Sequence, residues 1–432
     1  MSLVEKEITQ RNVELANNSP ELKNSRERER KFESSLHLLN VRQSEVLEQG
    51  AIPIKQIYLS SPDDEFDVRV RCVYKPEGNE YTATVKDRGE VIDGARDRLE
   101  VPTPISQESY ELYAAMPELA RLSKERTEVQ DGLTLDYIWG GFIKPSHYIF
   151  EVEHDDPNER ARLVAELKSM VVVPGYLQEV TGKRQFDSQE MAYEYSGVER
   201  KKAPESLDAF TERVLGEMVA QYVLGRKQVV VGLTGMSGSG KTTVAKALQA
   251  KITELYGEEF KPIVISTDDY HFGKTRLEEV HGAPYTAWDD AKTYNTEALA
   301  FDLQQLAEGI PLIKRHFDFD TEEPALDEEL PISPFVIIEG LYADSKDLEK
   351  VRDLHFELPT SIATSIGRDV RRLIIENRKN RAFPTAASRL RHLIETAAPM
   401  YMEREKPTPK SFSASSRPMA ERAFMLARLH EV

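Results

Sequence analysis

One stretch of the sequence, residues 229–243, reads VVVGLTGMSGSGKTT and constrains the fold more than any other. Three valines, a glycine-rich run and a helix-forming segment predict a strand, a loop and the first turn of a helix. The run fits the spacing G-x-x-x-x-G-K-[ST], in which backbone N–H groups of the loop surround phosphate oxygens. The helix that follows directs the positive end of its dipole at the same phosphates. The sequence therefore predicts a phosphate-binding loop in an α/β domain rather than an ordinary glycine turn.

Two side chains of this loop have chemistry suited to a nucleoside triphosphate. Lys241 would place a positive charge on the outer phosphates, and the Thr242 hydroxyl would ligate Mg²⁺. We expect ATP as the ligand, with Mg²⁺ or Mn²⁺. The residues expected to contact the ATP phosphates are Gly235, Ser237, Gly238, Ser239, Gly240, Lys241, Thr242 and Thr243.

Composition excludes several classes of protein. The 432 residues suffice for two or three domains, and a net charge of −17 argues against general nucleic-acid binding. The single cysteine, Cys72, excludes an intrachain disulfide and fits a reducing compartment. No apolar run reaches membrane-spanning length, and residues 1–20 lack a hydrophobic secretory core. We expect a cytoplasmic protein with no membrane or nucleic-acid partner.

The first half of the chain places like charges on one face of its predicted strands. Glu27 and Glu29 alternate along one segment, Arg69 and Arg71 along a second, and residues 151–153 carry glutamates at both ends. These charges can line a solvated outer face, which is the usual arrangement of an antiparallel sheet. They can instead line the lumen of a closed barrel, where carboxylates hold a divalent cation and basic residues neutralise a polyphosphate. Like charges at adjacent positions repel unless a ligand intervenes, which favours the lumen.

These segments resemble a known family. The pattern Glu27-x-Glu29-x-Lys31 resembles the opening of the CYTH, or triphosphate tunnel metalloenzyme, family. Further similar pieces follow in the family's order at residues 56–59, 68–71, 84–86, 98–100, 124–126, 136, 150–153 and 179–182. The resemblance implies an eight-stranded antiparallel tunnel. It implies a triphosphate or longer polyphosphate bound by Lys31, Arg69, Arg71, Lys86, Arg98, Lys124 and Arg126, and Mg²⁺ or Mn²⁺ bound by Glu27, Glu29, Glu151 and Glu153.

Two departures from this family's pattern affect the expected site. Pro102 stands where the family often has a further glutamate, and Asp187-Ser188 replaces a serine-asparagine pair. One metal ligand and the mouth of the tunnel are therefore expected to differ, and binding is better supported than turnover.

In the second half, two buried-type strands end in acidic residues. Residues 262–266 lead to Asp268, and residues 335–338 lead to Glu339. Strands that alternate with helices predict a parallel sheet, whose ligands gather at the carboxyl ends of the strands. Asp268 and Glu339 are therefore expected to act with Thr242 around Mg²⁺.

The order of these pieces resembles the uridine kinase and phosphoribulokinase family over residues 229–405. Residues 266–271 resemble its D-S-F/Y-Y stretch, 288–291 its W-D-H-P, 317–319 its Y-D-F and 339–343 its E-G-I-L-A. The resemblance implies in-line phosphoryl transfer from ATP to a small hydroxyl acceptor, with Asp268 as the base. It implies acceptor contacts from Asp289, Phe317 and Asp318, and lid arginines at Arg372, Arg378 and Arg381 within the basic run 368–381. That run can also be read as a solvated helix face.

The expected acceptor pocket departs from the uridine kinase pattern. Phe317 replaces a tyrosine, and the expected histidine falls at Glu322. A pocket that loses such donors loses discrimination for the base they read. The phosphoryl-transfer machinery is therefore expected to be intact, with uridine recognition altered.

The sequence thus predicts a polar leader (1–24), a tunnel domain (25–198), a linker with an amphipathic helix (199–226), a P-loop kinase domain (227–406) and a tail (407–432). Three hypotheses follow. The chain is a kinase fused to a polyphosphate-processing tunnel, a triphosphate or pyrophosphate hydrolase whose P-loop half only binds nucleotide, or a kinase regulated by a polyphosphate-sensing tunnel.

Overall fold

The computed structural model describes residues 25–34, 50–139, 147–170, 177–200, 205–285, 287–319, 321–375 and 383–403. The predicted leader, the tail, Arg378, Arg381 and residues 201–204 of the linker lie outside these ranges. The chain divides into two compact units, with boundaries at residues 203/204, 360/361 and 396/397. The first unit contains 361–396 as well as the N-terminal part, and the second contains the P-loop.

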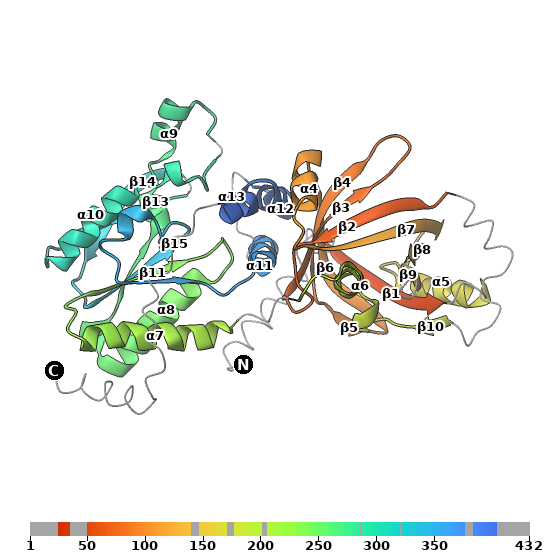
Figure 1. The fold of residues 1–432 in the computed structure, drawn as a ribbon, viewed down its shortest axis with the longest axis horizontal. Coiled ribbons are helices and arrows are strands. Elements are labelled where there is room, and N and C mark those ends of the chain that lie inside the picture. Colours follow the sequence, from red (N-terminus) through yellow and green to blue (C-terminus); the bar gives the residue numbers. More distant parts are fainter. Residues whose placement is uncertain are drawn as a thin grey trace. The chain divides into compact units, whose positions relative to one another are not determined.

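The first unit is built on an antiparallel barrel (Figure 1). Its strands pair in the order β1, β9, β8, β7, β2, β3, β4, β6, and pairing of β6 with β1 closes the ring of eight. The strands are β1 (Arg26–Ser34), β2 (Ile52–Tyr58), β3 (Phe66–Val73), β4 (Glu80–Asp87), β6 (Ala95–Pro104), β7 (Ala120–Gln130), β8 (Leu133–Ile138) and β9 (His147–Glu153). Two short strands pair with the barrel strands: β5 (Glu90–Ile92) pairs with β6, and β10 (Leu177–Glu179) pairs with β1. The predicted eight-stranded antiparallel fold is confirmed.

The barrel buries the charged faces of its strands. Glu29, Lys31 and Lys86 have exposed fractions of 2%, 6% and 4%, so these charges do not form a solvated outer face. The opposite faces are apolar and covered: α5 (Pro157–Met170) packs on one apolar cluster and α6 (Ser188–Ser196) on another. A third helix, α4 (Gln107–Ala114), follows β6. Because the outside carries the apolar core, the charges are left to line the inside.

The second unit contains a four-stranded parallel sheet in the order β12, β15, β11, β16 (Figure 1). Its strands are β11 (Val229–Thr234), β12 (Ile263–Ser266), β15 (Phe335–Gly340) and β16 (Leu354–Glu357). Two helices, α7 (Leu207–Val223) and α8 (Lys241–Tyr256), pack on one face, and α10 (Thr296–Ala307) packs on the other. The predicted parallel-sheet fold and its strand–loop–helix opening are confirmed.

Smaller elements complete the second unit. An antiparallel ribbon joins β13 (Leu312–Asp318) to β14 (Glu323–Leu330), and α9 (Lys274–His281) precedes it. A short 3₁₀ turn, η5 (Thr267–Tyr270), follows β12, and α13 (Ala398–Glu403) ends the described chain. Among the described residues, no helix combines the length and apolar character needed to cross a membrane.

The segment 361–396 packs in the first unit, although it follows the last strand of the kinase sheet. Its helices α11 (Ile362–Ile375) and α12 (Ala386–His392) contact β3, β4 and β6 of the barrel. Gly367 of α11 lies against the Phe66 ring, where any Cβ would overlap the ring. The Tyr113 hydroxyl of α4 donates a hydrogen bond to the Ile394 carbonyl (2.7 Å).

Candidate active sites

The phosphate-binding loop lies between β11 and α8, as predicted. Gly240 has φ +102° immediately before the helix, a conformation that favours glycine. A Cβ on Gly235 would lie 2.5 Å from Ser239 Oγ, so this turn also has no room for a side chain. Lys241 Nζ donates to the carbonyl oxygens of Gly235 (2.9 Å) and Met236 (3.1 Å) and thereby lies across the loop.

Carboxylates from two neighbouring strands face this loop. Thr242 Oγ1 donates to Glu339 at the end of β15 (3.1 Å). Asp268 follows β12, and burial and then the nearby Glu339 raise the pKa of its carboxyl to about 7, while Lys241 opposes the rise. The parallel strands thus bring Thr242, Asp268, Glu339 and Lys241 together, the arrangement that the sequence predicted. Oxygen ligands of this kind suit Mg²⁺.

Two of the predicted acceptor residues, Phe317 and Asp289, lie at a cluster of aromatic rings. Phe317 is 2% exposed, and its ring centroid lies 4.9 Å from that of His271. Trp288 and Tyr294 also pack on His271, at 5.9 and 4.2 Å. The charge of Asp289 acts on His271, and its backbone oxygen accepts a hydrogen bond from Tyr342 (2.7 Å).

His271 was not singled out from the sequence, although it directly follows the Asp268–Tyr270 stretch. Its ring is 7% exposed, and its buried Nδ1 has no hydrogen-bond partner among the described residues. Burial lowers its pKa to about 4, so the imidazole is neutral at pH 7. Glu322, which stands where the resemblance expected a histidine, pairs instead with Lys274 (2.6 Å).

Of the predicted lid arginines, Arg372 is described and lies on α11, in the first unit. The neighbouring Arg368 pairs with Glu65 at the start of the barrel strand β3 (2.8 Å). Arg378 and Arg381 fall outside the described residues.

The barrel lumen holds a network of ion pairs. Lys86 and Arg98 both bond to Glu27, at 2.7 and 2.5 Å, and Arg98 also bonds to Glu29 (2.6 Å). Lys31 pairs with Glu151 (3.0 Å). Two further cations, Lys124 and Arg126, share Asp136, and Arg126 also contacts Glu151. Every predicted phosphate-binding residue except Arg69 and Arg71 therefore has a carboxylate partner here.

Arg69 and Arg71 form no ion pair with a carboxylate among the described residues. Arg71 donates to Thr82 Oγ1 (2.9 Å), and burial together with the charges of Arg69 and Arg126 lowers its pKa. The Nε atom of Arg69 is buried without a hydrogen-bond partner in the described chain. Burial and two neighbouring cations thus disfavour the charged form of Arg71, and a bound anion would oppose both effects.

The structure groups the lumen carboxylates differently from the sequence-based expectation. Glu27 and Glu153 approach Glu100, and one oxygen from each lies within 4.8 Å of the others. Glu29 and Glu151, also expected as metal ligands, lie outside this group of three and contact cations, as Glu27 also does. Glu100 supplies the third carboxylate two residues before Pro102, where the resemblance expected one. The sequence signal for it was the alternation Arg98-x-Glu100, which places both residues on one face.

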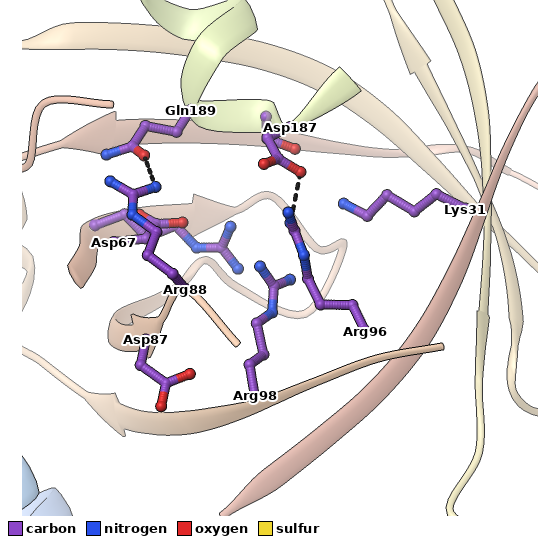
Figure 2. Close-up of a pocket in the computed structure, with 10 residues that line it drawn as sticks. Lys31, Asp67, Asp87, Arg88, Arg96, Arg98, Asp187 and Gln189 are labelled. Carbon is purple, nitrogen blue, oxygen red and sulfur yellow. Dashed lines mark hydrogen bonds and ion pairs between the residues drawn. The ribbon is translucent and has the colours of Figure 1, made fainter. Parts of the chain in front are cut away.

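Figure 2 shows a pocket at which Lys31, Arg96 and Arg98 point toward one another. Arg96 pairs with Asp187 (2.7 Å), and Arg88 donates to Gln189 (3.0 Å), so residues near the start of α6 border the pocket. The sequence predicted that the tunnel mouth differs at Asp187, but no sequence pattern singled out Arg88 or Arg96.

The sheet, loop and carboxylates of the second unit define a P-loop phosphotransferase fold. The model of the phosphoribulokinase / uridine kinase family matches residues 230–375. A uridine kinase of Leuconostoc citreum is 30% identical over 198 residues, which cover 43% of this chain and 86% of that protein. The chain therefore belongs to the phosphoribulokinase / uridine kinase family.

Two solved structures are similar to the N-terminal part. An inorganic triphosphatase is 21% identical with a TM-score of 0.23, covering 38% of this chain and 93% of its own. A Hippeastrum protein described with a dominant triphosphatase activity is 14% identical with a TM-score of 0.29, covering 38% and 95%. The barrel assignment itself rests on the strand pairing described above.

Proposed function

We propose that the second unit transfers a phosphoryl group from ATP to the hydroxyl of a small, nucleoside-like acceptor. The observation that carries this proposal is the meeting of Lys241, Thr242, Asp268 and Glu339 at one edge of the parallel sheet. Membership of the kinase family supports the same reaction class.

Different residues have different roles in the in-line displacement at the transferred phosphoryl group. The loop N–H groups and Lys241 hold the phosphates, and Lys241 would exchange its two carbonyl partners for phosphate oxygens. Asp268 accepts the proton of the acceptor hydroxyl. Thr242, Glu339 and Asp268 would hold Mg²⁺, which when bound offsets charge on the phosphates. Asp289, Phe317 and Asp318 would position the acceptor, while Arg372, Arg378 and Arg381 remain predicted lid residues.

The test is a substrate panel with matched variants in the two units. Purified protein receives ATP, Mg²⁺ and one of several nucleosides, and the phosphorylated product is measured. We expect Asp268→Asn to lower the rate at least 100-fold, because the base is lost. Glu27→Gln, a change of the same kind in the other unit, should leave this rate within twofold. Equal rates in wild type and Asp268→Asn would exclude Asp268 as the base, and no phosphorylated product from the wild type would show that the P-loop unit only binds nucleotide.

For the barrel we propose metal-dependent binding and hydrolysis of tripolyphosphate or a related phosphate chain. The carrying observation is that three carboxylates, Glu27, Glu100 and Glu153, meet inside a lumen lined by cations. A divalent ion at these oxygens and a polyanion at the lysines and arginines would satisfy both sets of charges.

The ion pairs of the lumen support this proposal. Lys86 and Arg98 neutralise Glu27 in the structure. A cation held by Glu27 would leave both side chains available to phosphate oxygens, so the charge balance of the buried lumen would be kept. Glu29 and Glu151 would hold Arg98 and Lys31 in place rather than bind metal.

The barrel proposal is tested by phosphate release from tripolyphosphate and pyrophosphate with Mg²⁺ or Mn²⁺. We expect Glu27→Gln to abolish release and Asp268→Asn to retain it. Calorimetric binding of tripolyphosphate without any release would instead favour the sensing hypothesis. If neither release nor binding is detected, the barrel proposal is wrong.

A further inference from the structure

The residues on either side of the segment 361–396 belong to the second unit. Immediately before it, Thr360 Oγ1 donates to the carbonyl of Ser239 in the phosphate-binding loop (2.8 Å). Shortly after it, the Tyr401 hydroxyl bonds to Glu357 at the end of β16 (2.5 Å). The chain therefore leaves the second unit beside the P-loop and returns beside the neighbouring strand.

The body of the same segment is packed on the barrel. Gly367 lies against Phe66, and Arg368 and Arg371 approach the Glu65 carboxylate at 2.8 and 3.9 Å. Further along, the Ser106 N–H donates to Glu395 (2.6 Å), and Arg391 donates to the Pro104 carbonyl (2.8 Å). Because a Cβ on Gly367 would overlap the Phe66 ring, this contact depends on glycine.

The barrel residues that α11 contacts lie next to residues that line the pocket shown in Figure 2. Asp67 directly follows Phe66 on β3 and lines the pocket together with Arg69. Asp87, at the end of β4, also lines it, and the charge of Arg371 acts on Asp87. The part of the barrel wall that β3 and β4 form therefore contains both residues that line the pocket and residues that contact α11.

We propose that tripolyphosphate bound in the barrel tightens nucleotide binding at the P-loop, and that α11 carries this coupling through Thr360. The inference rests on the proposed function of both sites. A ligand that bridges cations of β3 and β4 restrains the wall under α11, and α11 in turn restrains Thr360 beside Ser239. A loop that is already restrained loses less conformational entropy when nucleotide binds, which gives positive coupling.

The experiment measures the affinity of the full chain for ADP with and without saturating tripolyphosphate. ADP is the probe because it lacks the triphosphate chain that the barrel is proposed to bind. We expect at least about fivefold tighter ADP binding with tripolyphosphate, the lower end of typical allosteric coupling. Linkage requires ADP to tighten tripolyphosphate binding by the same factor. Hydrogen exchange in α11 and in the loop should slow when tripolyphosphate binds.

Variants separate the coupling from other effects. Glu65→Ala and Gly367→Ala should reduce the coupling below twofold while each ligand alone binds within twofold of wild type. Glu80→Ala is the control for Glu65→Ala, because Glu80 forms its ion pair with Lys75 (2.6 Å), a barrel residue outside the segment. Arg71→Ala should abolish the coupling by removing barrel binding. An effect that survives Glu65→Ala, Gly367→Ala and Arg71→Ala would reveal another route and overturn the inference.

Failure of the inference and failure of the proposed function give different results. Tripolyphosphate binding is first measured in Lys241→Ala, whose P-loop is impaired. One outcome is that tripolyphosphate binds to Lys241→Ala and yet leaves the ADP affinity of the wild type unchanged or weaker. In that case the coupling is wrong and the barrel proposal stands. If tripolyphosphate does not bind to Lys241→Ala, the barrel proposal and the coupling fall together.

Discussion

At the scale of single residues, the barrel lumen is a set of charges that neutralise one another until a ligand arrives. Arg69, Arg71 and Glu153 differ, because they form no ion pair among the described residues, and Glu153 instead approaches Glu27 and Glu100. Although its side chain as a whole is exposed, partial burial of its carboxylate and the charge of Glu27 raise its pKa to about 7. A metal ion would displace that proton, because carboxylates bind metal in the ionised form.

We therefore predict that the Mn²⁺ affinity of the barrel rises with pH. Below pH 7 the affinity should fall about tenfold per pH unit, since one proton must leave for each ion bound. Titration of the Asp268→Asn, Glu339→Gln double variant by electron paramagnetic resonance confines the signal to the barrel. Glu153→Gln should bind Mn²⁺ more weakly and without this slope. The same slope in Glu153→Gln would exclude Glu153 as its source.

His271 carries a second prediction at this scale. Its folded-state pKa of about 4 is below the ordinary value of 6.5, so the unfolded chain takes up the proton first as pH falls. The stability contributed by the neutral ring is present above pH 6.5 and is lost toward pH 4. Between pH 7 and pH 5 the free energy of unfolding of the second unit should fall by about 2 kcal/mol through this group.

The measurement uses the two tryptophans of the chain. In a Trp139→Phe background, Trp288 beside His271 becomes the sole reporter, because the chain holds two tryptophans. Denaturation curves at pH 7 and pH 5 are compared for the protein that keeps His271 and for its His271→Phe variant. The phenylalanine variant should lose about 2 kcal/mol less on acidification. Parallel losses in the two proteins would contradict a buried, neutral His271.

The sequence predicted which charges line the lumen but not how they pair. Alternation along a strand decides which face a residue occupies, and this placed Glu27, Lys31 and Arg98 correctly in the interior. Pairing depends on the register between strands far apart in the chain, such as β1 with β6, where Glu27 stands opposite Arg98. For this reason Glu100 was missed as the third carboxylate.

At the scale of elements, the P-loop and its sheet form where the sequence pattern predicts them. The strand, the loop and the helix are contiguous, so local patterning decides them. Close packing constrains the junction of β15 with η5. Gly340 has φ +153°, and a Cβ there would overlap the buried Thr267 side chain.

We predict that Gly340→Ala destabilises the second unit by about 1–3 kcal/mol, because overpacking forces neighbouring groups to move. The control is Gly216→Ala in the middle of α7, where a Cβ would meet nothing within 4 Å. That change should stabilise the unit by about 0.5–1 kcal/mol, since alanine favours the helix. Denaturation reported by Trp288 measures both. A neutral Gly340→Ala would show that the strand end adapts freely.

The segment 361–396 is the element that the sequence placed least well. Its kinase-like pattern is continuous with the P-loop region, and the family match extends to residue 375. Nothing in local patterning shows that α11 packs on β3, because this contact joins residues such as Glu65 and Arg368, 303 positions apart.

At the scale of the whole molecule, the chain joins two units that each have their own core and their own proposed phosphate site. A ligand that binds only the folded form of a unit stabilises that unit by RT ln(1 + [L]/Kd), about 2.7 kcal/mol at 100 times Kd. The two tryptophans report the units separately, because Trp139 belongs to the first and Trp288 to the second.

We predict that tripolyphosphate with Mg²⁺ stabilises the transition reported by Trp139 by at least about 2.7 kcal/mol at 100 times Kd, measured in a Trp288→Phe background. Mg²⁺–ADP should do the same for the transition reported by Trp288 in a Trp139→Phe background. Arg71→Ala should remove the first shift and keep the second, while Lys241→Ala should do the reverse. If both ligands shift only the Trp288 transition, the P-loop binds both of them and the barrel has no phosphate site of its own.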